Sequence, residues 1–360
     1  MISIAKPWIT QAETDAVIKV MDSGMIACGA TVSEFEREFA GYIGASHGIA
    51  TTSGTTALEI ALRAMGIGRG DKVITTAYSF IASTNSIVYV GATPVFVDID
   101  PDNFNIDTVS LRKALTENPD AKAMLIVHLF GQACNMDEIM ALAKEFDVMV
   151  LEDCAQSHGA KWNGKRVGSF GTAAAFSFYP TKNMTTGEGG IVLTSDDAIA
   201  EKARLLINHG MKVRYTHDEV GYNYRMTNIA AAIGLEQLKR LDGFNDKRRK
   251  AADFYNKNIN NPSVQVPSVD EGSYHVYHQY TIRVKDGKRD QLVKLFEENQ
   301  IGYGVFYPFS LPEQPCYEAF GFKKIWENTD LVKMEVLSIP VHPALSEEDI
   351  ATVAKVINSL

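Results

Sequence analysis

Short apolar runs alternate with helix-like segments between residues 45 and 240, and this alternation limits the fold more than any other feature of the chain. Two of the runs, residues 123–128 and 148–152, are apolar almost without a break. Strands that are buried on both faces have this composition, whereas strands with one wet face alternate between apolar and polar residues. The sequence therefore predicts an α/β protein whose central sheet is mostly parallel and is covered by helices on both faces.

The other elements of this region follow from the same patterns. Strands are predicted at residues 48–52, 72–76, 93–99, 173–178 and 190–194, and helices at 55–65 and 81–90. Gly66 and Gly68 are expected to end the first of these helices, because glycine readily follows the last turn of a helix. Each strand is thus followed by a helix or a loop that returns the chain to the same edge of the sheet.

The pattern changes near residue 240. A charged stretch opens a helix pattern that continues to about residue 259, and a strand at 277–284 and helices at 290–299 and 347–357 come later. We therefore predict a large α/β domain over residues 1–240, including the N-terminal segment, and a smaller α+β domain over residues 241–360. The basic run at residues 247–250 is interpreted as a solvated helix face.

Charge and composition exclude several classes of function. The net charge is −9 at pH 7, which argues against nucleic acid or an anionic membrane as a partner. The chain lacks a signal-peptide pattern and a run of about 18 apolar residues, so a cytoplasmic protein is expected. Its four cysteines have no CxxC spacing, and we interpret them as small buried side chains rather than metal ligands or disulfides. No metal site is predicted.

A candidate anion site lies at residues 53–56, where Ser-Gly-Thr-Thr follows a strand and opens a helix. Free backbone N–H groups, the helix dipole and the hydroxyls of Thr55 and Thr56 can together hold a phosphate dianion. The alternative is ordinary capping of the helix by a serine or threonine.

A candidate acidic group, Asp153, comes directly after the apolar run 148–152. Ligands of open α/β sheets bind outside the carboxyl ends of the strands. A carboxylate there can bond to the nitrogen of a pyridine ring and keep it protonated, and Gln156 can reach the ring hydroxyl. The alternative is a helix cap at Asp153 with Gln156 facing solvent.

A candidate nucleophile, Lys182, lies in a loop rich in threonine and glycine between two apolar strands. Its amine can form an imine with an aldehyde, Ser177 can add a hydroxyl to a phosphate site, and Phe80 can stack on a flat ring. The alternatives are a surface lysine and a core aromatic. An imine-forming lysine, a carboxylate for a ring nitrogen and a phosphate site are together what pyridoxal 5′-phosphate (PLP) requires.

Six segments together give the chain a family resemblance. It resembles the DegT/DnrJ/EryC1/StrS family of PLP-dependent sugar aminotransferases, which have the type I aminotransferase fold, from about residue 5 to the C-terminus. The segments that carry the resemblance are GTTAL at 54–58, ATPVFVDID at 92–100, HLFGQ at 128–132, EDCAQSHGA at 152–160, FSFYPTKNMTTGEGG at 176–190 and GYNYRM at 221–226.

The resemblance implies roles for single residues. Lys182 corresponds to the Schiff-base lysine and Asp153 to the partner of the pyridine nitrogen. Gln156 corresponds to the residue beside the ring hydroxyl, and Phe80 to the stacking aromatic. The resemblance also implies four phosphate binders: Thr55, Thr56, Ser177 and Asn223. Of these, Asn223 reaches across a homodimer interface into a shared active site.

The resemblance also bears on the reaction. Family members that act as 3-dehydrases have histidine in place of Lys182, so the lysine favours transamination. Phe306 departs from the family pattern, since many relatives have a histidine there within a His-Tyr-Pro sequence.

The expected reaction is transfer of an amino group, with L-glutamate as the donor, to a keto group of a nucleotide-linked keto-deoxysugar. The loop at residues 185–190 resembles that of relatives that aminate C4, which favours C4 over C3. The alternatives are amination of a cyclitol or another non-nucleotide ketone, and a non-catalytic PLP-binding regulatory protein. The sequence does not specify the nucleotide or the sugar.

Overall fold

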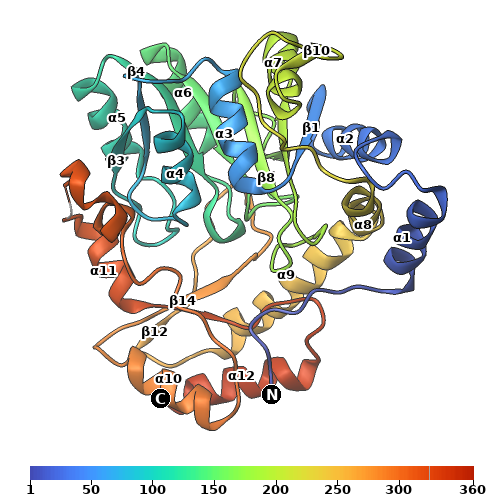
Figure 1. Cartoon of the computed structure of the whole chain (residues 1–360). Helices are drawn as coiled ribbons and strands as arrows, with labels where there is room; N and C mark the ends of the chain where they lie inside the picture. The colour runs from blue at the N-terminus through green and yellow to red at the C-terminus, as the bar shows by residue number, and fades with distance from the viewer. Residues whose placement is uncertain (324) are drawn as a thin grey trace.

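The computed structural model describes residues 1–323 and 325–360. A seven-stranded sheet, in the order β1-β9-β8-β5-β4-β2-β3, forms the centre of the larger part (Figure 1). Only β9 runs antiparallel to its neighbours among these strands, so the prediction of a mostly parallel sheet is confirmed. The strands are β1 (His47–Thr51), β2 (Lys72–Thr76), β3 (Thr93–Val97), β4 (Ala121–Val127), β5 (Met149–Asp153), β8 (Ala173–Ser177) and β9 (Gly190–Thr194).

The sheet separates two apolar cores because neighbouring side chains of a strand point to opposite faces. In β4, Met124 and Ile126 belong to one core and Leu125 and Val127 to the other. Helices contribute to the cores on both faces, as the continuous apolar runs indicated. The helices are α2 (Ala30–Ile43), α5 (Thr108–Glu117), α6 (Met136–Phe146) and α8 (Asn228–Leu238) on the first face, and α3 (Gly54–Ala64), α4 (Ala82–Tyr89) and α7 (Asp197–Ile207) on the second.

The C-terminal part has a core of its own, built on a three-stranded antiparallel sheet in the order β12-β14-β15. In Figure 1 it lies below the large sheet, and the N-terminal segment runs down to it. Ile2 packs against this C-terminal core and pairs with Ile301. Its elements are α9 (Leu241–Asn258), β12 (Val264–Gln265), β14 (Tyr280–Val284), α10 (Arg289–Glu298), α11 (Glu327–Glu335), β15 (Val336–Ile339) and α12 (Glu347–Asn358). The domain boundary near residue 240 stays a prediction.

The remaining elements are short or peripheral. Helix α1 (Gln11–Ser23) packs on α8 at the edge of the molecule. Two small sheets and three 3-10 turns complete the described chain. One sheet contains β6 (Lys161–Trp162), β7 (Lys165–Arg166) and β13 (Ser273–Tyr274), and the other contains β10 (Met211–Val213) and β11 (Thr216–His217). The turns are η1 (Leu129–Gly131), η2 (Leu311–Glu313) and η3 (Pro315–Phe320).

Three local expectations need correction. Arg248 does not lie on a solvated face: it is 5% exposed, and it donates to the backbone oxygens of Tyr277 and His278. All four cysteines are free, but Cys28 and Cys316 are exposed rather than buried. The strand predicted from residue 277 begins only at Tyr280, since Tyr277 has a φ of +44°, which lies outside the β region.

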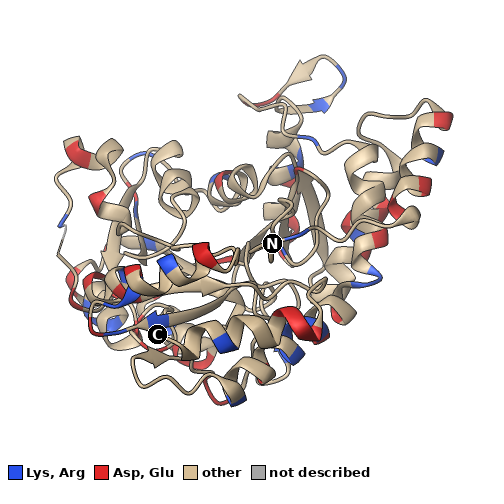
Figure 2. Ribbon diagram, turned by 90° about the horizontal axis from the view of Figure 1, so that it is seen from below, with Lys and Arg blue, Asp and Glu red and all other residues tan. Residues whose placement is uncertain are grey.

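Basic and acidic residues are interspersed along the outer helices, as Figure 2 shows. Most of the ion pairs of the described chain are at least partly exposed, such as Arg112 with Glu145 at 2.6 Å and Lys72 with Asp120 at 2.9 Å. Such pairs contribute little to stability. Among the described residues, no helix has the length and hydropathy needed to cross a membrane.

Candidate active site

A cavity of about 420 Å³ lies at the carboxyl ends of β4, β5 and β8, and the start of α3 forms part of its wall. Val127, Asp153 and Ser177, the last residues of those three strands, all line it. This is the edge of a parallel sheet at which α/β proteins bind their ligands. Of the eight residues predicted for the site, six line this cavity: Thr55, Phe80, Asp153, Gln156, Ser177 and Lys182.

Asp153 is buried at the floor of the cavity. Its Oδ2 accepts a hydrogen bond from the hydroxyl of Ser83 at 2.8 Å, and its Oδ1 accepts one from the backbone N–H of Ala155 at 3.1 Å. Burial raises the pKa of Asp153, and these two donors and the positive charge of Lys182 partly oppose the rise. No helix follows Asp153 directly, so the alternative of a helix cap is wrong. A carboxylate with two donors keeps the capacity to accept further hydrogen bonds from a ligand.

Gln156 is buried beside Asp153 rather than facing solvent. Its Oε1 accepts from the backbone N–H of Phe130 at 2.8 Å, which fixes the orientation of the amide. Its Nε2 therefore faces the cavity side and donates to the hydroxyl of Tyr307 at 3.0 Å. The amide is thus held in place from both ends, with one N–H still free to bond a ligand.

Lys182 lies at the cavity wall in the loop between β8 and β9. The loop is held by its threonines: Thr185 donates its hydroxyl to the backbone oxygen of Phe178 at 2.7 Å, and Thr186 donates its own to that of Glu188 at 2.8 Å. Burial lowers the pKa of Lys182 to about 8, although the nearby charge of Asp153 raises it. No described residue forms a hydrogen bond or ion pair with its amine, which is therefore available for covalent chemistry.

The start of α3 forms another part of the cavity wall. Ser53 caps the helix by accepting from the N–H of Thr56 at 3.2 Å, and Thr56 donates its hydroxyl back to the oxygen of Ser53 at 2.8 Å. The N–H groups of Gly54 and Thr55 have no acceptor within the described chain. A Cβ on Gly54 would lie 2.5 Å from Cβ of Ser177, so only glycine allows the helix to approach the end of β8. Capping and anion binding are thus compatible here.

Phe80 is 55% exposed and lines the cavity near the ring of Tyr307, at 6.2 Å between centroids. The alternative of a core aromatic is wrong. An exposed ring at a cavity wall is free to stack on a flat ligand.

Two of the predicted residues lie outside the cavity lining. Thr56 is one residue further along α3 than Thr55. Asn223 is exposed, and its backbone pairs with that of Asn208, away from this chain's own cavity. The residues on either side of it, Tyr222 and Tyr224, stack on each other at 4.9 Å between ring centroids.

Several residues of the cavity were not predicted from the sequence. His278, Tyr307 and Ser83 line it. Tyr78 is fully buried beneath it and holds the segment that carries Tyr307, because its hydroxyl donates to the oxygen of Phe306 at 2.9 Å and accepts from the N–H of Tyr307 at 2.6 Å. Phe306, the residue at which the sequence departs from the pattern expected from the resemblance, also lines the cavity.

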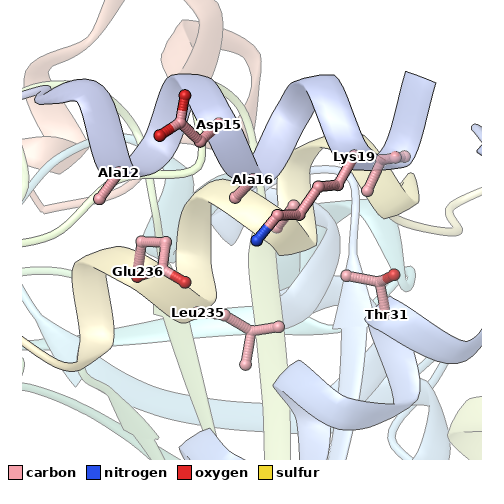
Figure 3. A pocket seen from close by; sticks show the side chains of 9 residues that line it. Ala12, Asp15, Ala16, Lys19, Thr31, Leu235 and Glu236 are labelled. Atoms are coloured by element: carbon pink, nitrogen blue, oxygen red, sulfur yellow. The ribbon is translucent and has the colours of Figure 1, made fainter. Parts of the chain in front are cut away.

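A second hollow, of about 370 Å³, lies between α1 and α8. Figure 3 shows Lys19 reaching from α1 over Leu235 of α8, with the small side chains of Ala12 and Ala16 on the wall. None of the predicted site residues lines this hollow. It therefore results from small residues at a helix contact, whereas the cavity at the strand ends gathers polar groups from distant parts of the chain.

One buried group of the described chain has the composition of a metal site: His128, Glu152 and Cys154, whose ligand atoms lie within 4.8 Å of one another. Hydrogen bonds already occupy both ring nitrogens of His128 and both carboxylate oxygens of Glu152. Nδ1 of His128 accepts from the N–H of Cys134 at 3.0 Å, so Nε2 carries the proton and donates to Glu152 at 3.1 Å. The group is therefore a hydrogen-bonded cluster that holds the end of β5.

Comparison with known proteins identifies the class. The fold is the type I fold of PLP-dependent aminotransferases: the structure of Spr1654 from Streptococcus pneumoniae in its PLP form matches with a TM-score of 0.91 and 27% identity, covering 99% of this chain and 98% of that one. Residues 7–358 match the DegT/DnrJ/EryC1/StrS aminotransferase family. The chain belongs to this family, and it is a PLP-dependent aminotransferase.

Two curated relatives span nearly the whole chain. The pleiotropic regulatory protein of Geobacillus stearothermophilus is 44% identical, covering 92% of this chain and 89% of its own length. GDP-perosamine synthase of Caulobacter vibrioides is 42% identical, covering 97% and 95%.

The residues present fit the cofactor. Counting partners among the described residues, the cavity offers an unpaired amine on Lys182, an incompletely bonded carboxylate on Asp153, and two free N–H groups at the start of α3. These are the three kinds of contact that a pyridine aldehyde with a phosphate requires.

Proposed function

We propose that the protein transfers an amino group from L-glutamate to the keto group of a nucleotide-linked keto-deoxysugar, with C4 favoured over C3. The observation that carries this proposal is the convergence of Lys182, Asp153 and Gln156 on one cavity that the start of α3 also lines. The preference for C4 rests on the loop at residues 185–190 and its resemblance to that of C4-specific relatives.

We assign the following roles around the cofactor. Lys182 would hold it covalently and, once released by the amino donor, would carry a proton between the reacting carbon and the cofactor. Asp153 would keep the ring nitrogen protonated, and Gln156 would bond the ring hydroxyl. When bound, PLP draws electron density away from the reacting carbon. Phe80 would stack on the ring.

The phosphate would be held by the start of α3 and the end of β8. The free N–H groups of Gly54 and Thr55, with the hydroxyls of Thr55 and Ser177, would supply the hydrogen bonds. Thr56, predicted as a further phosphate binder, already donates its hydroxyl to the oxygen of Ser53 and would instead hold the start of the helix in place. We further propose that Asn223 completes the phosphate site of a second copy of the chain, so that a homodimer has two shared sites. Its exposed position, away from this chain's own cavity, supports that assignment. A cytoplasmic location stays a prediction.

The names of the relatives support a nucleotide sugar without specifying it. GDP-perosamine synthase acts, by its name, in making a GDP-linked sugar. A cyclitol or another non-nucleotide ketone stays the alternative acceptor. One relative is named as a regulatory protein, and a non-catalytic PLP-binding regulatory protein is the other alternative. Measured turnover separates an aminotransferase from such a protein.

The test has two steps. Adding L-glutamate to the PLP-loaded protein should shift the visible absorbance of the lysine-bound cofactor to that of its aminated form. The aminated protein should then react with one of a set of GDP-, UDP- and dTDP-linked 4-keto and 3-keto sugars, and scyllo-inosose should not react. No spectral change with glutamate, or reaction with the cyclitol alone, would contradict the proposal.

The shared site has its own test. Lys182→Ala and Asn223→Ala subunits should each have low activity, and mixing them should restore part of it. A mixed dimer then has one site with both substitutions and one with neither. No recovery despite demonstrated subunit exchange would rule out sharing.

A further inference from the structure

His278 is a buried histidine of the cavity to which no role has been given above. It is 4% exposed, lies between β13 and β14, and lines the same cavity as Lys182. The orientation and the protonation of its ring can both be derived from a chain of hydrogen bonds that ends at backbone oxygens.

The chain runs through two asparagines. Asn245 of α9 donates its Nδ2 to the backbone oxygen of His158 at 2.9 Å. Asn183, the residue after Lys182, donates its Nδ2 to Oδ1 of Asn245 at 2.8 Å and to the backbone oxygen of Val276 at 3.1 Å. Backbone oxygens only accept hydrogen bonds, so the orientation of each amide is fixed.

The tautomer of His278 follows from this orientation. Its Nδ1 lies 3.2 Å from Oδ1 of Asn183. Oδ1 is an acceptor, so Nδ1 must carry a proton. Burial, and the positive charges of Lys182 and Arg248, hold the pKa of His278 well below its usual range, so the ring is neutral. Nε2 therefore has a lone pair, and no described residue donates to it.

We infer that Nε2 of His278 accepts a hydrogen bond from a hydroxyl of the ketone substrate. A carboxylate offers only lone pairs, so the carboxylates of the amino donor are poor partners for this nitrogen, whereas a sugar hydroxyl can donate to it. Because Asn183 directly follows Lys182, the hydrogen-bond chain fixes Nε2 relative to the reacting amine. The inference rests on the proposed function, and it makes His278 a residue that selects hydroxylated acceptors.

The direct test compares the two half-reactions. His278→Phe keeps a flat ring and removes the lone pair. It should lower kcat/KM for the keto sugar that wild type aminates by about tenfold, and leave the reaction with L-glutamate nearly unchanged. His275→Phe is the matched control, because His275 is equally buried three residues away but lies outside this cavity. Equal losses in both half-reactions, or no loss, would overturn the inference.

Two further measurements keep the inference testable if His278→Phe does not fold. In wild type, a keto sugar that lacks the relevant hydroxyl should react about tenfold more slowly than its parent, and equal rates for every such deoxy analogue would overturn the inference. Nitrogen NMR of histidine-labelled apoprotein should show the His278 ring as neutral with its proton on Nδ1, and a proton on Nε2 would likewise overturn it.

The outcomes also separate this inference from the proposed function. If wild type reacts with L-glutamate but with no hydroxylated ketone, the assignment of the acceptor and the role of His278 both fall. If wild type aminates a keto sugar and His278→Phe slows both half-reactions alike, only the role of His278 falls.

Discussion

Glu152 and Asp153, neighbouring carboxylates at the end of β5, lie on opposite faces of the sheet because side chains alternate along a strand. Glu152 accepts four hydrogen bonds: from the His128 ring at 3.1 Å and from the backbone N–H groups of Gly168, Phe170 and Gly171 at 2.7, 2.8 and 2.7 Å. Asp153 accepts only two from the described residues, and it lines the cavity.

The pKa values of the two carboxyl groups shift in opposite directions because Glu152 has more hydrogen-bond donors than Asp153. Burial alone raises the pKa of Glu152, but its donors, His128 foremost, more than offset that rise and lower it. Burial raises the pKa of Asp153, and its fewer donors do not offset it. A carboxylate whose bonding capacity is filled by the protein holds the fold together, and one that is left partly unbonded at a cavity is available for a ligand.

The largest expected difference between the two faces is in catalysis. Asp153→Asn should slow the reaction with L-glutamate by about 10²-fold or more, because the ring nitrogen loses the charge that keeps it protonated. The thermal midpoint of the apoprotein should change little. Stopped-flow absorbance and calorimetry measure the two quantities. A wild-type rate in this variant would show that Asp153 has no part in the chemistry.

The complementary change on the other face should affect stability instead. Glu152→Gln replaces a charged acceptor of four donors with an amide whose N–H₂ group faces other N–H groups. The unfolding free energy of the apoprotein should fall by about 3 kcal/mol, as measured by urea denaturation. The folded, PLP-loaded variant should react with L-glutamate at nearly the wild-type rate. A stable but slow variant would remove the distinction between the two carboxylates.

A smaller effect is expected from the hydroxyl that donates to Asp153. Ser83→Ala should slow the glutamate half-reaction by about tenfold, and Ser83→Thr should restore most of the loss. Ser86→Ala is the control, since Ser86 is equally buried on the same helix and donates to the backbone oxygen of Ser83 at 2.8 Å instead. Equal effects of the two alanine variants would indicate a general packing role.

The smallest effect is a shift in pH dependence. Burial lowers the pKa of Lys182 to about 8, and only the neutral amine is nucleophilic. The rate of PLP capture by apoprotein should therefore rise with pH and reach half its maximum near pH 8. Asp153→Asn removes a charge that raises this pKa, so its midpoint should lie at a lower pH. A midpoint that does not move, or moves upward, would contradict the coupling of the two groups.

The sequence predicted the sheet well because its strands are buried on both faces. The strands at 72–76 and 190–194 have the predicted bounds, and the apolar runs at 123–128 and 148–152 correspond to strands at 121–127 and 149–153. The cavity residues at strand ends were predicted because the carboxyl ends of parallel strands meet at one edge of the sheet. Asp153 and Ser177 therefore had to lie near each other.

Two of the cavity residues that the sequence did not predict come from the C-terminal part. His278 and Tyr307 reach the cavity from segments after residue 240, and their position depends on how that part packs on the large sheet. The burial of Arg248 depends on a distant contact within the C-terminal part, because its partners Tyr277 and His278 lie 29 and 30 residues further along. Charge alone predicted a solvated face there. Contacts between distant segments leave no periodic pattern, so single-sequence reasoning does not find them.

The most direct test of the account is to find which lysine holds the cofactor. The PLP-loaded protein should be reduced with borohydride, digested and mapped by mass spectrometry, with Lys182→Ala treated in parallel. The account predicts a pyridoxyl adduct on Lys182 in wild type and no adduct in the variant. An adduct on another lysine in wild type, or equal labelling of the variant, would contradict it.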